Sequence, residues 1–285
     1  DVVMGQRPPV RTLVVALCLA YMFLLALGQA GLRYGRMNRR PTQFMEMLIL
    51  VQFFVGVSYI ASVALLEAGL GLATDRQCHV AIRTCIGMYS SGKIALYLFF
   101  IERVHVVRAP LVRRFRDRVW IIGVLMTVLG LGGITGYELV SPHAVLSHAD
   151  GYCRIGVASD AAICIITMDT LIGTLLTAIF IGILRPSLRS TAIRPEAGMD
   201  RRRGSSIMPI IRQKKRSTEV SARQHLKVML WRNIIGSCVI LANTLINNII
   251  FLTWKYAMRS HVCLLTCLTD IVVSIMVTNW LTMGS

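Results

Sequence analysis

Residues 78–111 read CHVAIRTCIGMYSSGKIALYLFFIERVHVVRAPL, and this stretch decides the fold. It begins at a cysteine and runs roughly 25 residues, at ~1.5 Å per residue, to the pair Glu102-Arg103. A helix of that length crosses a lipid bilayer. Lys93 lies in the middle, and the polar side chains before it recur at helical spacing. The pattern therefore predicts a helix that is buried among other helices rather than facing lipid.

The composition places the rest of the chain in a membrane as well. Hydrophobic residues make up 55% of the 285 residues and charged residues only 16%, so a soluble globular protein is not expected. The net charge of +17 would suit nucleic acid only if the basic residues covered a folded soluble face. Here they lie between hydrophobic runs. Binding to nucleic acid is therefore not expected.

Six further apolar runs join the central one, and each is long enough to cross a bilayer. The sequence predicts an all-α membrane protein with one seven-transmembrane domain over residues 1–285. The predicted spans are about 12–32, 44–66, 79–104, 119–137, 158–184, 228–254 and 261–283.

The basic residues predict the orientation, because cytoplasmic loops retain Lys and Arg. Residues 33–40, 103–118 and 185–232 hold 23 of the 31 Lys and Arg residues. The N-terminus is therefore expected outside and the C-terminus in the cytoplasm, with any cytoplasmic tail missing from this sequence. The basic loop 185–227 contains proline and glycine and is expected to be partly disordered.

Eight cysteines fall into two groups. Cys78 and Cys153 lie at positions expected outside the membrane, where the compartment is oxidising. They are expected to form a disulfide that ties the loop after the fourth span down over the bundle, and two free thiols are the alternative. The other six lie inside expected spans and are expected to be buried thiols: Cys18, Cys85, Cys164, Cys238, Cys263 and Cys267.

Several motifs follow one another in order along the third span and beyond it. They are Cys78, the pair Glu102-Arg103, Pro110-Leu111 in the following loop, and Cys153 in the second outer loop. In this order they resemble the rhodopsin-like, class A-type G-protein-coupled receptors, whose third helix carries such a cysteine and a Glu/Asp-Arg pair, with Pro-Leu in the loop that follows. Residues 97–108 also resemble uncharacterised seven-span membrane proteins of fungi.

The resemblance implies a plasma-membrane receptor that senses an extracellular small molecule or lipid. Its basic cytoplasmic loops would then signal to a heterotrimeric G protein, and the coupling residues would be Glu102, Arg103, Pro110 and Leu111. The chain also departs from the family, since Val104 follows the arginine where tyrosine is usual, and no proline lies inside an expected span. These departures favour a distant relative, or altered signalling, over an ordinary member.

The charged residues inside the spans are candidates for a buried site. Lys93 lies too deep to reach either surface, and an unpaired charge there would cost at least ~2.5 kcal/mol. Asp270 and Asp169 reach similar depths, so we expect Lys93 to pair with Asp270 or, failing that, with Asp169. Tyr89 and Tyr97 lie four residues on either side of Lys93 and share its helical face. That face should point into the bundle.

Asn243 and Asn247 share one face of the sixth span and are expected to form interhelical hydrogen bonds. With Tyr89, Lys93 and the two aspartates they could line a ligand pocket. The alternative function is a transporter or lipid-handling membrane protein, in which Lys93, Asp169 and Asp270 form a polar path. Internal repeats and broken helices, which many transporters have, are not evident in the sequence.

Enzyme function is not expected, because the sequence has no nucleophile elbow, phosphate loop or zinc-binding His-Glu-x-x-His. A retinal Schiff base is disfavoured because residues 262–285 contain no lysine. No cofactor or metal site is expected. The expected partners are therefore the bilayer, the G protein and an unidentified outer ligand.

Overall fold

Seven helices of the computed structural model are long and apolar enough to cross a membrane. The structure describes residues 7–35, 43–108, 113–147, 152–156, 159–192, 209–254 and 259–283. The spans found there are Pro8–Leu32, Gln43–Leu70, Asp75–Arg108, Arg118–Val140, Ile163–Gly182, Leu230–Phe251 and Ser260–Met283. They confirm the expected all-α bundle with seven spans, whereas its orientation in a membrane stays a prediction.

The helices follow one another along the chain, and the second and fourth spans each contain a π-helical segment. In chain order the elements are α1 (Pro8–Gly35), α2 (Gln43–Val63), the π-helical η2 (Ala64–Leu70), α3 (Asp75–Arg108), the 3-10 turn η3 (Arg114–Arg116), α4 (Arg118–Leu125), the π-helical η4 (Met126–Leu131), α5 (Gly132–Val140), β1 (His143–Leu146), β2 (Cys153–Gly156), α6 (Ser159–Ala192), α7 (Pro209–Trp254) and α8 (Ser260–Met283).

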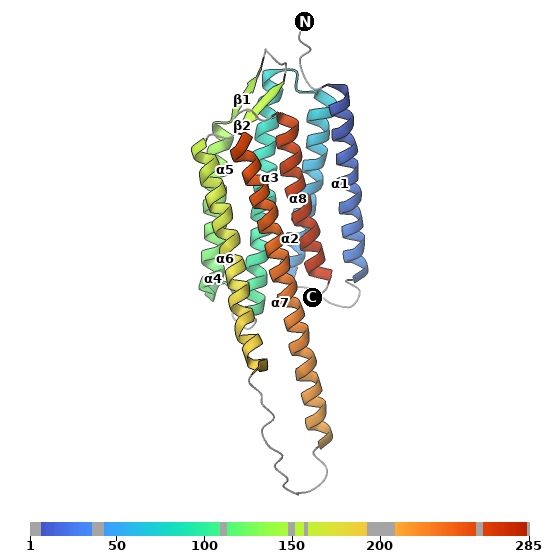
Figure 1. Cartoon of the computed structure of the whole chain (residues 1–285), viewed down its shortest axis with the longest axis vertical. Coiled ribbons are helices and arrows are strands. Elements are labelled where there is room, and N and C mark those ends of the chain that lie inside the picture. The colour runs from blue at the N-terminus through green and yellow to red at the C-terminus, as the bar shows by residue number, and fades with distance from the viewer. Residues whose placement is uncertain are drawn as a thin grey trace.

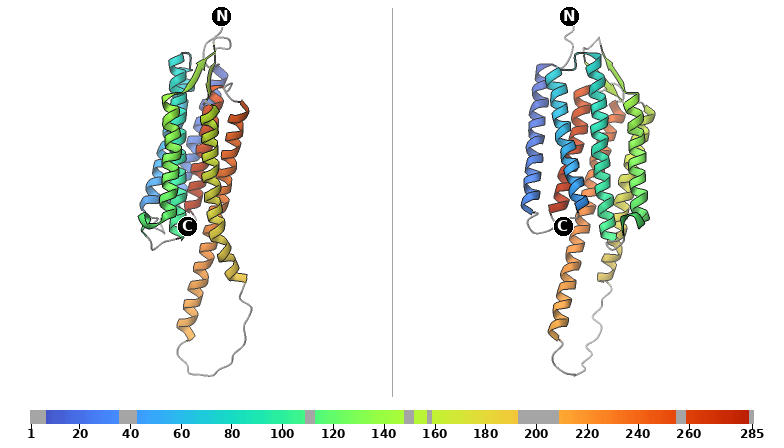
Figure 2. Two further views of the ribbon diagram at one scale, coloured as in Figure 1. Left: turned by 90° about the vertical axis from the view of Figure 1, so that its left-hand side faces the viewer. Right: turned by 180° about the vertical axis from the view of Figure 1, so that it is seen from behind.

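The helices run side by side, with α3 at the centre of the bundle (Figures 1 and 2). α3 packs against α2, α4, α5, α6 and α8, and against both strands. We call the end of the bundle that carries β1, β2 and Cys78 the hairpin end, and the end that carries Arg103 the arginine end. At the arginine end α1, α3 and α6 end, and α2, α4 and α7 begin (Figure 1). Basic residues at these helix ends, such as Arg108 and Arg118, therefore lie at one end of the bundle.

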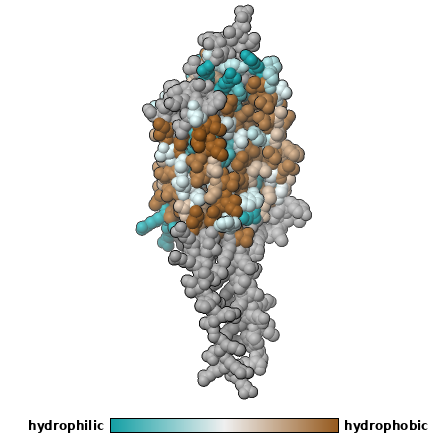
Figure 3. Space-filling view, viewed as in Figure 1, coloured by the Kyte–Doolittle hydropathy of each residue, from teal (hydrophilic) through white to brown (hydrophobic). Residues whose placement is uncertain are grey.

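On the face shown in Figure 3, apolar side chains cover the middle of the bundle and hydrophilic ones lie towards its ends. Among the large apolar residues that point outward are Phe54, 71% exposed, and Leu129, 69% exposed. Single exposed leucines need no explanation, but a continuous apolar belt indicates contact with lipid. By contrast, α3 carries buried residues along most of its length, from Cys78 to His105.

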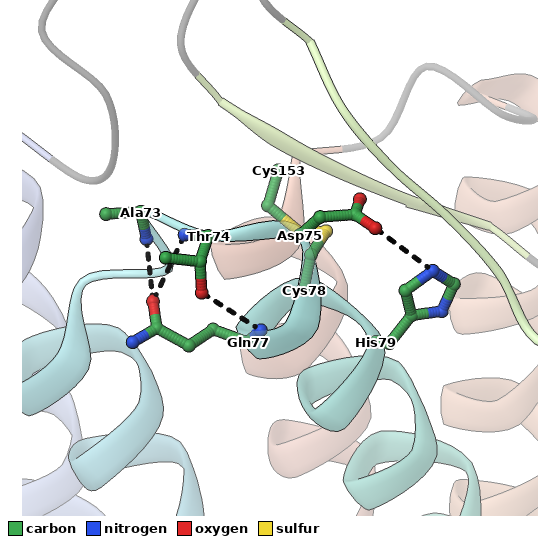
Figure 4. Close-up of a disulfide and its surroundings, with 7 residues drawn as sticks. All are labelled: Ala73, Thr74, Asp75, Gln77, Cys78, His79 and Cys153. Carbon is green, nitrogen blue, oxygen red and sulfur yellow. Dashed lines mark hydrogen bonds and ion pairs between the residues drawn. A yellow bond between two sulfur atoms is a disulfide. The ribbon is translucent and has the colours of Figure 1, made fainter.

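Polar caps and a glycine set the ends of the helices at the hairpin end. Gly71 follows η2 with φ +70°, a left-handed conformation that glycine adopts at little cost, and its N–H donates to the Leu66 carbonyl at 3.1 Å. At the start of α3, the Gln77 side chain accepts from the Thr74 N–H at 3.2 Å, and the Thr74 hydroxyl accepts from the Gln77 N–H at 3.4 Å (Figure 4). This reciprocal capping box fixes where the third span begins.

A two-stranded antiparallel sheet closes the hairpin end, in the connection that the sequence indicated only as a loop. β1 pairs with β2 in a register that places Leu146 opposite Cys153. Cys153 lies at disulfide distance from Cys78 near the start of α3, with the two Cα atoms 5.7 Å apart (Figure 4). Both cysteines are buried. The expected pair thus lies where it can fasten the hairpin to α3.

Two sequence predictions, on the buried thiols and on the basic loop, differ in part from the structure. Cys164 and Cys238 are exposed on outward faces of α6 and α7, so the prediction that they are buried was wrong. A helix in the outer ring turns only one face inward, and span position alone does not say which. In the basic loop 185–227, α6 reaches Ala192 and α7 begins at Pro209. The remainder of that loop, like Pro110 and Leu111, lies outside the described residues.

Candidate functional site

Lys93 lies at the middle of α3 and faces two carboxylates. Its side chain is 3% exposed, and Nζ lies 2.9 Å from Asp270 Oδ2 and 3.6 Å from Asp169 Oδ2. Nζ also donates to the hydroxyl of Thr244. The expected pair with Asp270 is therefore present, and Asp169 is a second partner rather than a substitute. These contacts join α3 to α6, α7 and α8.

Asp270 is held by more groups than the lysine alone. Its Oδ2 accepts a hydrogen bond from the Tyr89 hydroxyl at 2.8 Å, and its Oδ1 accepts one from the Asn243 side chain. Asn247 in turn donates to the Tyr89 hydroxyl at 3.3 Å. Each of these partners is a hydrogen-bond donor to the acid or to its neighbour, so the arrangement suits an ionised carboxylate.

Asp169 has a smaller set of partners. The Tyr97 hydroxyl donates to its Oδ1, while its Oδ2 faces Lys93 at 3.6 Å, beyond a close hydrogen bond. We call the whole group the Lys93 network. Its members are Tyr89, Lys93, Tyr97, Asp169, Asn243, Thr244, Asn247 and Asp270.

The local sequence of α3 explains this geometry. Tyr89, Lys93 and Tyr97 recur every four residues and therefore lie on one face of the helix. That single face brings each tyrosine to a different aspartate. A cavity of about 10 Å³ lies beside Lys93, with Gln52 and Ser274 among its lining residues. It has room for roughly one water molecule, whereas small-molecule pockets occupy about 300–1,000 Å³.

A second polar group lies at the arginine end. Arg103 is only 1% exposed, and its guanidinium donates to Asn233 Oδ1 at 2.6 Å and to the Leu281 carbonyl at 3.1 Å. The guanidinium also lies over the Phe99 ring, 5.4 Å from its centroid. These contacts, which we call the Arg103 clasp, join the end of α3 to α7 and α8. Arg103 is therefore inside the bundle in this conformation and not on an open coupling surface.

Glu102 is held by one group from η3 and one from α4. It accepts hydrogen bonds from Arg114 Nε at 2.9 Å and from Trp120 Nε1 at 3.1 Å. The neighbouring residues in sequence, Glu102 and Arg103, thus reach different helices. The pair fixes α3 on two sides at once.

Asp117 anchors the same region from just before α4. Its carboxylate accepts from the Val119 N–H at 3.1 Å and lies 2.9 Å from His105 Nδ1 and 2.6 Å from Arg108 Nη2. Burial alone raises the pKa of this carboxyl, but the hydrogen bonds from His105 and Val119 and the Arg108 charge outweigh it and lower the pKa below its ordinary value. The carboxylate form is thus the one that the fold stabilises.

The structure brings together the six residues expected to line a buried polar site. Sequence reasoning missed Thr244, and it placed Asn233 near the expected asparagines without pairing it with Arg103. It also missed Trp120 and Arg114 as partners of Glu102. Thr244 could have been found because it is a polar residue in the middle of its span, at about the depth of the buried Lys93. The rotation of α7 decides which of its polar residues face inward, and the sequence does not give that rotation.

No family model matches the chain, and no curated protein that was compared with it matches either. The seven long apolar helices are consistent with a seven-span membrane protein, and such helices imply association with a lipid bilayer. The resemblance to receptors therefore rests on the motifs along α3 and on Cys153.

Proposed function

We propose that this protein is a plasma-membrane receptor with its hairpin end outside, and that it couples to a heterotrimeric G protein at the arginine end. The observation that supports this most strongly is that α3, α7 and α8 are joined twice. The Lys93 network joins them in mid-bundle, and the Arg103 clasp joins them at the end. A shift in the first contact would be transmitted to the second by rigid helices.

The distance between these two contacts suits such a relay. Ten residues separate Lys93 from Arg103, which is about 15 Å along a helix. Both contacts consist of a buried cation with partners on other helices. Such contacts have two discrete states, formed and broken, rather than a continuous range of intermediate geometries. An outer small molecule or lipid that binds better to the separated state would shift the population towards it.

In this proposal the described conformation is the resting one. Arg103 is buried, so the basic surface that would bind a G protein is complete only after α7 moves away from α3. The Lys93 network acts as a lock and not as the floor of a pocket, because the cavity beside it is only about 10 Å³. Pro110 and Leu111 keep their proposed role in coupling.

The transporter alternative uses the same three charges as a polar path. It requires that Lys93, Asp169 and Asp270 become exposed to water first on one side of the membrane and then on the other. In the described conformation they meet one another and neighbouring hydroxyl and amide groups instead. This mutual pairing favours the receptor.

The test is nucleotide exchange on purified heterotrimeric G proteins mixed with the protein in lipid nanodiscs. We expect Asn233→Ala to raise basal exchange, because it removes a partner that holds Arg103 inside. Arg103→Ala should abolish exchange both in the wild-type protein and in the Asn233→Ala variant. Arg76→Ala serves as a matched control, since Arg76 is exposed on α3 at the hairpin end. Equal exchange with and without the protein, across the heterotrimer classes, would reject coupling.

A further inference from the structure

Three cysteines meet inside the bundle at a place that neither polar network uses. Cys85 comes from α3, and Cys263 and Cys267 come from α8. Their three sulfur atoms all lie within 4.8 Å of one another, and the Cys85 and Cys263 sulfurs are 3.9 Å apart. Each of the three residues is 3% exposed. We call this group the thiol cluster.

The helices explain how the cluster forms. Cys263 and Cys267 are four residues apart and therefore share one face of α8. That face packs against α3, where Cys85 lies seven residues after Cys78. The Tyr59 hydroxyl of α2 donates to the Cys85 sulfur at 3.3 Å, and this contact orients the sulfur. Four side chains from three helices thus converge on one point.

The spacing of the sulfurs matches that of a metal–thiolate centre. A metal bonds to cysteine sulfur at about 2.3 Å, so three sulfurs around one ion in a plane lie about 4.0 Å apart. The 3.9 Å contact already has that value, and the other sulfurs need only small side-chain rotations to reach it. Soft sulfur ligands select soft ions such as Cu(I) and Zn(II).

We propose that the thiol cluster binds one soft, thiophilic metal ion, with Cys85, Cys263 and Cys267 as its ligands. Cu(I) accepts three sulfur ligands, whereas structural Zn(II) sites usually have four ligands, so Cu(I) is the better match. Each thiol that binds as thiolate releases its proton to the solvent, and no electron is transferred. The Tyr59 hydroxyl donates to a ligand sulfur in the manner of an outer-shell partner.

The bound ion would clamp α3 to α8 one helical turn from the Lys93 network. Cys85 lies four residues before Tyr89, and Cys267 lies three residues before Asp270. The same two helices that hold the buried charges would thus also share a metal ion. A metal that binds only the assembled cluster stabilises the folded bundle by mass action. This inference stands apart from the receptor proposal, because it requires only the packing of α3 on α8.

The first experiment measures metal content after purification of the whole chain under reducing conditions. Apo protein is titrated with Cu(I) in one series and with Zn(II) in another, each against a competing chelator. We expect one ion per chain in the Cu(I) series, and an X-ray absorption spectrum showing sulfur neighbours at about 2.3 Å. Preference for Zn(II) with the same sulfur shell would support the site but change its ion.

Substitutions distinguish loss of the metal site from a general loss of folding. Cys85→Ser, Cys263→Ser and Cys267→Ser should each lose the bound ion and the metal-dependent rise in the melting temperature. Cys18→Ser is the matched control, because Cys18 is also a buried thiol but lies on α1 outside the cluster, and it should keep both. Tyr59→Phe should weaken affinity by about 10–100-fold.

Two results would overturn the proposal. One is wild-type protein that binds neither ion although its three thiols are reduced. The other is metal that stays bound with no sulfur neighbour in the absorption spectrum. The spectrum of the wild-type protein decides the question even if a serine variant fails to fold.

Discussion

Asp270 and Asp169 face the same lysine but are held to different degrees. Asp270 lies at 2.9 Å from Lys93 and accepts hydrogen bonds from two further side chains. Asp169 lies at 3.6 Å and accepts one from Tyr97. Removing one partner of a buried ion pair typically costs about 3–5 kcal/mol, because the remaining charge loses its compensation. The two aspartates should therefore respond differently to the same substitution.

We expect Asp270→Asn to lower the melting temperature in nanodiscs more than Asp169→Asn does. Around Asp270 the new amide N–H would face partners that are themselves donors at close range. At Asp169 the amide oxygen can keep the hydrogen bond from Tyr97, and the amide N–H faces Lys93 only across the longer contact of 3.6 Å. Lys93→Met should cost at least as much as Asp270→Asn, because it leaves two buried carboxylates without the cation that both contact. Asp75→Asn, at an exposed position, should melt like the wild type. A larger loss for Asp169→Asn than for Asp270→Asn would contradict this ranking.

At the scale of single elements, α4 begins at a charged cap that depends on pH. Because its pKa is lowered in the folded protein, the Asp117 carboxylate contributes stability above its unfolded pKa of about 3.9, and that contribution is lost as the pH falls through the lower folded value. Wild-type protein should exceed Asp117→Asn in stability by roughly 1–2 kcal/mol at pH 7. The gap should begin to close as the pH falls below about 4 and should shrink further through the lower folded pKa. Denaturant unfolding across pH 3–7 measures it, and a gap independent of pH would refute the role of the charge.

The hairpin β1–β2 depends on its link to α3. A covalent bond between Cys78 and Cys153 closes a loop with a sequence separation of 75, and we expect its loss in Cys78→Ser to cost about 2–4 kcal/mol. Mass spectrometry without reductant should find the two peptides joined. Cys164→Ser, an exposed thiol on α6, should leave stability unchanged. Alkylation of both Cys78 and Cys153 in folded protein would show that the bond is absent.

The sequence predicted elements better than it predicted contacts between them. Apolar length alone located the seven spans, and the four-residue spacing of Tyr89, Lys93 and Tyr97 placed one face of α3 correctly. The partner Asn233 and the thiol cluster could not be predicted, because they depend on how α3, α7 and α8 are rotated against one another. The spacing of Cys263 and Cys267 shows a shared face, but it does not say what that face meets.

At the scale of the whole molecule, the orientation in the membrane is predicted from the distribution of Lys and Arg along the sequence. An epitope tag inserted near residue 200, between α6 and α7, should bind antibody only after cells are permeabilised, because basic connections stay in the cytoplasm. A tag placed ahead of Arg7 should bind on intact cells. Both tagged proteins should melt like the untagged one, which controls for misfolding. The opposite labelling pattern would invert the proposed topology.

The helix α7 gives the molecule a mechanical property that its polar contacts do not reveal. It runs without internal proline from Pro209 to Trp254, and its first part extends beyond the other helices (Figure 1). From Pro209 to Asn243 it measures about 50 Å at 1.5 Å per residue. With Asn243 as the fulcrum, a tilt of about 5° moves the far tip by roughly 4–5 Å over this length. In the proposed receptor, a small tilt of α7 within the bundle would thus become a displacement several times larger at its projecting end.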